Sequence, residues 1–524
     1  MELKRKYPVG IQDFEKLRTN GYVYVDKTDL VYRLAQKDYI FLSRPRRFGK
    51  SLLTSTLKYY FQGRKDLFQG LAIEHLEKDW TQYPVFHFDL STLKNVDVDV
   101  TLSKLDGILS SYEQVYGRNP VNITPGDRLS NLIKTVHSQT GNKVVVIIDE
   151  YDAPMLDVLH DNEKMNKVRT MMQEFYAPLK ACDADLRFVF ITGITKFSQL
   201  SIFSVVNNLT NVSMSPEYSA ICGITEEELH TVFAQDIALL AEEYECNFEQ
   251  MCLRLKERYD GYHFSGRSAD IYNPFSLLKA FAQKEIKDYW FESGTPTFLI
   301  QQMIEFNIDV TSLDGIEASS SSFDRPTEAM TDALPLLYQS GYLTIKSYDR
   351  DFGTYLLGIP NKEVKVGLTE NLLPVYTKRS DFENDSLVQK FCRALLREDL
   401  EVALTAMRAY LAGIPYPDGG KEVLEDMSKN EYYYETIFYL MFSFMNRHIQ
   451  TQVKTCRGRA DIVMSTPKSI YVFELKINKS AQEALKQIDE RGYMVPYTAD
   501  GRKLVKCGIS FSTETRTIED WIIE

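Results

Sequence analysis

The sequence lacks the cysteine and histidine patterns that build disulfide frameworks and zinc sites. Its seven cysteines are odd in number, scattered from Cys182 to Cys507, and contain no Cys-x-x-Cys pair. The seven histidines are equally dispersed and give no His-x-x-x-His pair. Because disulfide scaffolds need paired thiols and zinc sites need closely spaced ligands, neither is indicated. We expect the chain to fold in a reducing environment.

Long apolar runs are also missing. The opening Met-Glu-Leu-Lys-Arg-Lys-Tyr-Pro has no apolar signal core, and no later run approaches the roughly eighteen apolar residues of a membrane span. We therefore expect a cytoplasmic protein that has no membrane contact. The formal net charge of -12 argues against a surface broadly built for nucleic acid, although a local basic groove is compatible with it.

A compact basic turn joins a strand-like run to a helix-like segment near the N-terminus. In phosphate-binding loops, backbone N–H groups and a helix N-terminus surround phosphate oxygens, a lysine reaches the terminal phosphates and a hydroxyl binds Mg²⁺. Lys50 and Ser51 fit these roles, and Arg46, Arg47 and Gly49 are expected beside the nucleotide. The alternative is a basic turn on a solvated surface, because short motifs also occur by chance.

Arg44 departs from the usual phosphate-loop pattern, which has a glycine at this place. A Cβ atom restricts the loop backbone, so we expect the nucleotide to be held in a variant geometry or weakly. The three arginines between positions 44 and 47 could in part replace the lost backbone contacts by their charge.

A second strand-like run ends in adjacent acids. Five consecutive β-branched residues at 144–148 predict a strand that is buried on both faces of a parallel sheet. At its carboxyl end, where open α/β sheets bind ligands, we expect Asp149 to hold Mg²⁺ and Glu150 to polarise an attacking water. Thr192 ends another strand-like run and is a candidate sensor of the terminal phosphate, although threonine in a strand is usually only a β-former.

The chain alternates between strands and helices in its first part. Strand-like segments near residues 39, 85, 144 and 188 predict a parallel sheet with crossover helices. Thr28 is expected to cap a helix over 29–37, and Asp26 with Lys27 could line the nucleotide pocket. Thr225 is expected to begin another helix. The sequence has no internal repeat at a fixed period. We predict an α/β protein with a P-loop NTPase-type domain (1–215), a mostly helical middle section (216–378) and a smaller α/β domain (379–524).

Another group of charged residues lies near the C-terminus. Asp461 and Glu474 stand on two strand-like runs joined by a short turn, so hairpin pairing should bring them side by side. Glu474 and Lys476 should share a face, because side chains at i and i+2 of a strand point the same way. Two carboxylates and a lysine suit Mg²⁺-dependent phosphodiester hydrolysis. The alternative is an ordinary cross-strand salt bridge.

Flanking helices could complete this C-terminal group. Either Glu431 or Glu435 could join the metal shell, since residues four apart share a helix face. Gln487, from a predicted helix over 480–493, could face the same site. Basic residues that could contact nucleic-acid phosphates are Lys454, Arg457, Arg459 and Lys479.

The whole chain resembles bacterial two-domain proteins that join an AAA-ATPase-like N-terminal domain to a C-terminal PD-(D/E)XK nuclease-like domain. The resemblance implies ATP binding, a metal site on Asp461, Glu474 and Lys476, and Glu431 as the better helical acid. Arg44 looks typical of such proteins. The segments that carry the resemblance are 24–28, 44–51, 148–152, 192–196, 272–274, 358–364, 458–461 and 474–476.

Three functions are compatible with these patterns. The first is an ATP-regulated nuclease that uses ATP and Mg²⁺ and acts on DNA or RNA. The second is a nucleotide-gated binding or signalling switch whose nuclease-fold domain does not cut. The third is a non-catalytic scaffold with a vestigial phosphate loop. A homo-oligomer is left open, because arginine fingers often come from a neighbouring subunit.

Overall fold

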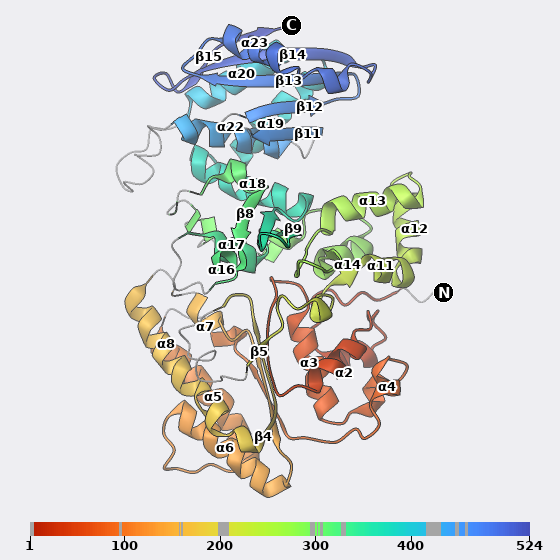
Figure 1. Cartoon of the computed structure of the whole chain (residues 1–524), viewed down its shortest axis with the longest axis vertical. Helices are drawn as coiled ribbons and strands as arrows, with labels where there is room; N and C mark the ends of the chain where they lie inside the picture. Colours follow the sequence, from red (N-terminus) through yellow and green to blue (C-terminus); the bar gives the residue numbers. More distant parts are fainter. Residues whose placement is uncertain are drawn as a thin grey trace. The chain divides into compact units, whose positions relative to one another are not determined.

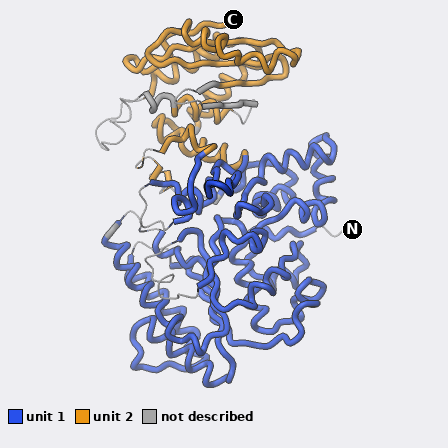
Figure 2. Tube along the Cα trace, in the orientation of Figure 1, with its two compact units in different colours: residues 1–292, 316–361 blue, residues 293–315, 362–524 orange. Residues whose placement is uncertain are grey.

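The chain forms two compact units in a computed structural model. The first unit comprises residues 1–292 and 316–361, and the second comprises 293–315 and 362–524 (Figure 2). The three-part division at residues 215 and 378 stays a prediction. The structure describes residues 5–93, 97–156, 158, 161–196, 209–293, 299–300, 302–303, 306, 308–325, 332–414, 431–445, 450–455 and 460–524. Within these ranges, no helix has both the length and the apolar character needed to cross a bilayer.

The first unit is built on a five-stranded parallel sheet with the strand order β2-β3-β4-β1-β5. The strands predicted near residues 39, 85, 144 and 188 are confirmed. The two-residue β5 was not predicted, because two polar residues carry no strand pattern. The strands are β1 (Tyr39–Ser43), β2 (Val85–Asp89), β3 (Val144–Asp149), β4 (Leu186–Gly193) and β5 (Thr210–Asn211).

Helices cover both faces of this sheet (Figure 1). Helices α2 to α4 lie on one side, and α5, α6 and α8 lie on the other. All six residues of β3 are buried, as expected for a strand covered on both faces. The helices are α1 (Phe14–Thr19), α2 (Thr28–Ala35), α3 (Lys50–Phe61), α4 (Ile73–Leu76), α5 (Val98–Tyr116), α6 (Pro125–Thr140), α7 (Ala153–Leu156), α8 (Asn162–Tyr176) and α9 (Pro178–Ala181).

The predicted N-terminal cap of α2 is wrong, because Thr28 is already helical. Its backbone N–H and its hydroxyl both donate to Asp26 Oδ1, at 2.9 and 2.7 Å. The other carboxylate oxygen of Asp26 accepts from the N–H of Ala72 at 2.7 Å. Asp26 therefore ties the start of α2 to the start of α4.

A helical group and a small sheet complete the first unit. The predicted helix start at Thr225 is confirmed, because its hydroxyl accepts from Glu228 N in a capping box. The antiparallel sheet β8-β10-β9 was not predicted. The elements are β6 (Ile224–Thr225), α11 (Glu226–Val232), α12 (Ala234–Glu243), α13 (Phe248–Tyr259), β7 (Ile271–Tyr272), α14 (Pro274–Gln283), β8 (Ile316–Ser319), α16 (Ser320–Phe323), α17 (Leu334–Ser340), β9 (Thr344–Asp349) and β10 (Thr354–Gly358).

Asp260, directly after α13, is a buried acid with a raised pKa. Burial is the largest cause and, with the nearby carboxylates of Asp270 and Glu226, it raises the pKa from 3.8 to about 7 against the opposing charge of Lys256. The Lys256 ammonium lies 3.9 Å away. The ionised form of Asp260 is therefore disfavoured in the folded state.

The stability of the first unit should accordingly fall as the pH rises through the interval between these two pKa values. The unfolded chain releases the Asp260 proton near pH 3.8, whereas the folded chain keeps it to about pH 7. We expect Asp260→Asn to gain melting temperature relative to the wild type between pH 5 and 7, with a constant difference above pH 7. Thermal melts across this range measure the effect, and parallel curves for the two proteins would contradict it.

The second unit is built on a five-stranded sheet with the order β11-β12-β13-β14-β15, in which only β13 and β14 are parallel. The predicted hairpin of β12 and β13 is confirmed. Gly508 allows α23 to approach β14, because a Cβ there would lie 2.3 Å from the Ala481 carbonyl oxygen. The elements are α18 (Lys362–Thr377), α19 (Asp381–Leu396), α20 (Leu400–Ala412), α22 (Glu431–Met445), β11 (Gln450–Thr455), β12 (Ala460–Ser465), β13 (Ser469–Ile477), α23 (Ala481–Arg491), β14 (Lys503–Ser512) and β15 (Thr517–Ile523).

Candidate functional site

The basic turn at 44–49 connects β1 to α3, as the sequence predicts. Gly49 has a φ of 90°, a conformation that favours glycine, and it immediately precedes the helix. The ammonium of Lys50 donates to the carbonyl oxygens of Arg44 and Pro45, at 2.9 and 3.0 Å. Burial lowers the pKa of Lys50, while Glu150, Asp149 and Asp152 oppose this shift. The loop therefore closes around its own lysine.

Arg44 does not offer its charge to a ligand, contrary to the expectation that all three arginines could compensate for the missing glycine. Its buried guanidinium donates to the carbonyl oxygens of Ser43, Ser213 and Tyr218, at 2.8, 2.8 and 3.0 Å. It also lies over the ring of Phe264, 4.2 Å from the centroid. Burial lowers the pKa of Arg44 to about 10. Arg44 anchors the loop to the protein interior.

The two other arginines have different surroundings. Arg47 adopts a φ of 69° and lies over the ring of Phe275, 4.6 Å from the centroid. The carbonyl oxygen of Arg46 accepts a hydrogen bond from the Trp290 indole at 3.4 Å. The charge available to phosphates from this loop is therefore that of Arg46, Arg47 and Lys50.

Gly341 lets the basic turn at 44–49 (the phosphate-type loop) pack closely against the end of α17. It has a φ of +88°, and a Cβ there would lie 2.7 and 2.9 Å from Cβ and Cγ of Pro45. We expect Gly341→Ala to lower the free energy of unfolding through backbone strain and through overpacking of about 1–3 kcal/mol. Gly353→Ala is the matched control, because Gly353 has a φ of +66° with nothing within 4 Å of its Cβ position. Thermal melts of both variants measure the difference, and equal losses would contradict the overpacking.

Asp149 lies beside Lys50 and Ser51, so the fold brings these three predicted residues together. A hydrogen bond with Ser51 and the charge of Lys50 lower the pKa of Asp149, but burial is the larger effect and raises it to about 6. Oδ1 of Asp149 accepts from the N–H of Glu150 at 2.9 Å. Glu150 itself adopts a φ of 48° and is half-buried.

Thr192 lies on β4 next to the phosphate-type loop, but its hydroxyl points into the sheet. It is fully buried and donates to the Leu42 carbonyl oxygen at 2.7 Å. Thr192 would have to leave this bond before it could donate to a phosphate. Its role as a sensor stays a prediction.

Asp152 has a structural role that was not predicted. Its Oδ2 accepts from the N–H groups of Ile194 and Thr195, at 3.0 and 2.7 Å, and from the Thr195 hydroxyl at 2.7 Å. A Cβ on Gly193 would lie 2.4 Å from Oδ1 of Asp152. The turn after β3 therefore holds the loop that follows β4. The only signal in the sequence was a second acid three residues after Asp149.

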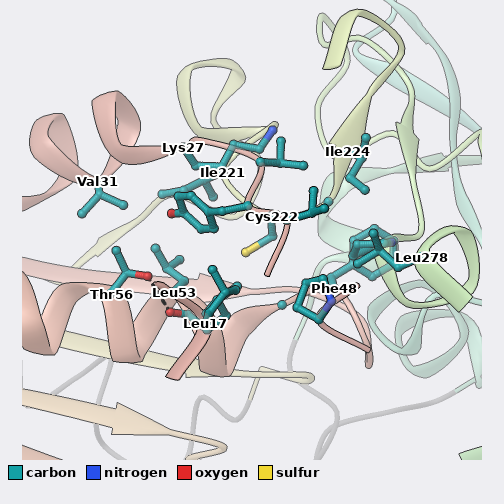
Figure 3. Close-up of a pocket in the computed structure, with 18 of the residues that line it drawn as sticks. Leu17, Lys27, Val31, Phe48, Leu53, Thr56, Ile221, Cys222, Ile224 and Leu278 are labelled. Atoms are coloured by element: carbon teal, nitrogen blue, oxygen red, sulfur yellow. Dashed lines mark hydrogen bonds between the residues drawn. The ribbon is translucent and has the colours of Figure 1, made fainter. Parts of the chain in front are cut away.

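An apolar pocket of about 100 Å³ lies beside the phosphate-type loop (Figure 3). Its walls come from the N-terminal segment, from α3 and from the segments around α11 and α14, which no local sequence pattern links. Lys27 lines this apolar pocket and donates to both carboxylate oxygens of Glu228, at 2.5 and 2.6 Å, whereas Asp26 does not line it. Their placement beside a nucleotide stays a prediction. Apolar residues in the wall include Leu17, Val31, Phe48, Leu53, Ile221 and Leu278.

The predicted C-terminal group lies on the hairpin of the second unit. Asp461 of β12 is the register partner of Glu474 on β13. Glu474 and Lys476 are buried, and the Lys476 ammonium donates to Glu474 Oε1 at 3.0 Å and to the Gln487 side chain. The side chains of Glu431, Glu435, Lys454 and Asp461 lie outside the described residues, as do Arg457 and Arg459 as a whole.

Two family models match the chain. One, described as a predicted AAA-ATPase, matches residues 8–203, and the other, for the PD-(D/E)XK nuclease superfamily, matches residues 429–521. The chain is also 33% identical over 528 residues to a protein of Azotobacter chroococcum mcd 1 described as "Uncharacterized protein in vnfD 5'region", with 99% of each chain covered. The chain belongs to the AAA-ATPase-like proteins with a C-terminal PD-(D/E)XK domain.

A solved structure of the ORC2 protein of Aeropyrum pernix, in ADPNP and ADP complexes, shares 12% identity with this AAA-ATPase-like protein. The match has a TM-score of 0.25 and covers 64% of this chain and 90% of that one.

The donors in the ATPase-like domain fit Mg²⁺. The Ser51 hydroxyl and the Asp149 carboxylate are hard oxygen ligands that lie within hydrogen-bonding range of each other. Among the described side chains, no group of three or more His, Cys, Asp or Glu residues is placed to hold a metal ion.

Proposed function

We propose that this AAA-ATPase-like protein is an ATP-regulated nuclease. It binds and hydrolyses ATP in its first unit and cleaves nucleic-acid phosphodiesters in its second. The observation that supports this best is the meeting of Lys50, Ser51 and Asp149, from two separate segments, beside an apolar pocket. The pocket suits a nucleobase, because ligand sites combine apolar walls with a few placed polar groups.

In the ATPase-like domain, Lys50 is assigned to the terminal phosphates, and Arg46, Arg47 and Gly49 to the remaining phosphate contacts. Ser51 and Asp149 would hold Mg²⁺, which supplies charge neutralisation when bound. Glu150 stands next to Asp149 and is assigned to the attacking water. A phosphate bound here would compete with Leu42 for the Thr192 hydroxyl.

In the PD-(D/E)XK domain, Asp461, Glu474 and the helical Glu431 are assigned to Mg²⁺. Lys476 is assigned to the water, since its ammonium is held between Glu474 and Gln487. The Glu474 carboxylate offers hard oxygen ligands of the kind that Mg²⁺ prefers, and its Oε1 accepts from the Lys476 ammonium at 3.0 Å. Nucleic acid is therefore the proposed partner.

Titration with Mg²⁺·ATP and a cleavage assay on DNA and RNA, both single- and double-stranded, test this function. We expect saturable nucleotide binding, release of phosphate, and Mg²⁺-dependent cleavage whose rate changes with ATP. Binding without cleavage of any substrate would support the nucleotide-gated switch instead. A flat titration would leave the scaffold function.

This proposal assigns ATP to residues 1–215 and the metal-dependent cleavage to 379–524, with the section 216–378 between them. It needs ATP and Mg²⁺, which agrees with the cytoplasmic location expected from the sequence. A homo-oligomer would allow an arginine of one copy to reach the nucleotide of another.

A further inference from the structure

Residues 316–361 belong to the first unit, although the chain on either side of them belongs to the second (Figure 2). This segment carries the small sheet β8-β10-β9 with α16 and α17. It lies well outside residues 8–203, which the AAA-ATPase model matches. Two of the three passages of the chain between the units, at 315/316 and 361/362, flank the segment.

The segment 316–361 contacts the loop that follows β4, at residue 196. The ammonium of Lys196 lies 2.5 Å from Oδ2 of Asp324, and their side chains are 7% and 18% exposed. The backbone N–H of Lys196 donates to Gln339 Oε1 at 2.8 Å, and Gln339 Nε2 donates to the Arg325 carbonyl oxygen at 2.7 Å. A largely buried ion pair is costly to break, because the remaining charge loses its partner. The position of Lys196 is therefore tied to that of Asp324.

The same loop is held from the nucleotide side by Asp152. This residue accepts from Ile194 and Thr195, which are the two residues before Lys196. Asp152 lies three residues after Asp149, and its charge acts on Lys50. From the turn that carries Asp149, hydrogen bonds of Asp152 to residues 194 and 195 and the ion pair of Lys196 thus lead to Asp324.

The segment also contacts the phosphate-type loop directly. Gly341, after α17, lies against Pro45. Thr344, at the start of β9, accepts from the His263 N–H at 2.8 Å and donates to the His263 carbonyl oxygen at 3.1 Å. The rings of Tyr262 and Phe264, on either side of His263, pack edge-on against Phe48, with centroid distances of 4.7 and 5.2 Å. The segment 316–361 therefore contacts the loop directly at Pro45 and reaches Phe48, which lines the pocket, through residues 262–264.

We propose that nucleotide binding changes the conformational stability of the segment 316–361, and that the Lys196–Asp324 pair transmits this change. The pair and Gln339 are positioning groups, which act on the nucleotide through the loop at 193–196. A ligand can shift a conformational equilibrium only where it changes contacts. The loop at 193–196 directly follows Thr192, so a phosphate bound beside Thr192 and Lys50 would change its contacts. This inference rests on the proposed nucleotide binding. The segment that responds is joined at both of its ends to chain that belongs to the second unit.

Hydrogen exchange of the full-length protein, with and without Mg²⁺ and the non-hydrolysable analogue AMP-PNP, tests the proposal. In the wild type we expect amides of α17 and β9 to exchange several-fold more slowly with the analogue, as local opening is suppressed. The double variant Lys196→Met/Asp324→Leu removes both charges together and should lose this slowing while binding the analogue within about threefold of wild type. Asp332→Asn, which removes a partly buried ion pair with Arg325 in the same segment, should keep it.

Gln339→Met is the second variant, because it removes both Gln339 hydrogen bonds and keeps the side-chain size; it too should lose the slowing. Analogue binding without slower exchange in the wild type overturns the inference and leaves the nucleotide site standing. Slowing that persists in both variants overturns it as well. A flat binding titration of the wild type overturns the nucleotide site and the inference together.

Discussion

Replacing Lys50 with alanine should weaken Mg²⁺·ATP binding and raise its dissociation constant by about a hundredfold or more. The Lys50 ammonium is buried under the loop, donates to two loop carbonyls and lies among the charges of Asp149, Glu150 and Asp152. Its removal takes away the cation that balances both the acids and the incoming phosphates. Isothermal titration of the purified variant measures the change.

Lys58→Ala is the matched control for this experiment. Lys58 is on the same helix, is half-buried and lies 5.0 Å from the Tyr59 ring centroid. We expect it to bind Mg²⁺·ATP like the wild type. Near wild-type affinity in Lys50→Ala would remove the assignment of 44–51 as the phosphate loop, even if the protein hydrolyses ATP by other means.

Glu474→Gln and Lys476→Met should each reduce Mg²⁺-dependent cleavage by about a hundredfold or more. Glutamine keeps the size of Glu474 and an acceptor for the Lys476 ammonium, but it removes the charge that would bind the metal. Methionine keeps the buried stem of Lys476 and removes the group assigned to the water. Cleavage rates at saturating Mg²⁺ measure both effects.

An exposed pair on α23 provides the controls. Lys486 and Glu490 form an ion pair at 3.3 Å, with side chains 71% and 62% exposed. Lys486→Met and Glu490→Gln repeat the same chemical changes on the helix that carries Gln487, and they should leave cleavage unchanged. Wild-type cleavage in both Glu474→Gln and Lys476→Met would mean that these two residues of β13 have no catalytic role.

Local patterns were enough to predict the grouping of candidate residues. A strand-turn-helix carrying Lys50 and a buried strand ending in Asp149 place both residues at the carboxyl edge of one parallel sheet. Period-two alternation and a short turn likewise placed Glu474 and Lys476 on one face and Asp461 opposite Glu474. These predictions succeeded because each depends on a regular backbone period within a short segment.

The Thr28 cap failed by one position at a helix start, whereas the other expectations that the structure did not bear out depend on contacts between distant segments. The sequence does not show that Arg44 turns inward, because its carbonyl partners on Ser213 and Tyr218 lie far along the chain. The apolar pocket was not predicted for the same reason, since its lining residues come from four separate segments. No role was predicted for Asp152 or Lys196, because their partners follow from the tertiary fold.

The inward arginine at position 44 has a kinetic consequence. Loops that order only when a ligand arrives lose conformational entropy at that moment and associate slowly. Here a guanidinium already fastens the first residue of the loop to three carbonyl groups, and the Lys50 ammonium fastens two loop carbonyls from the other end. Nucleotide capture should therefore resemble rigid docking, with a single fast association phase and differences in affinity expressed in the rate of release.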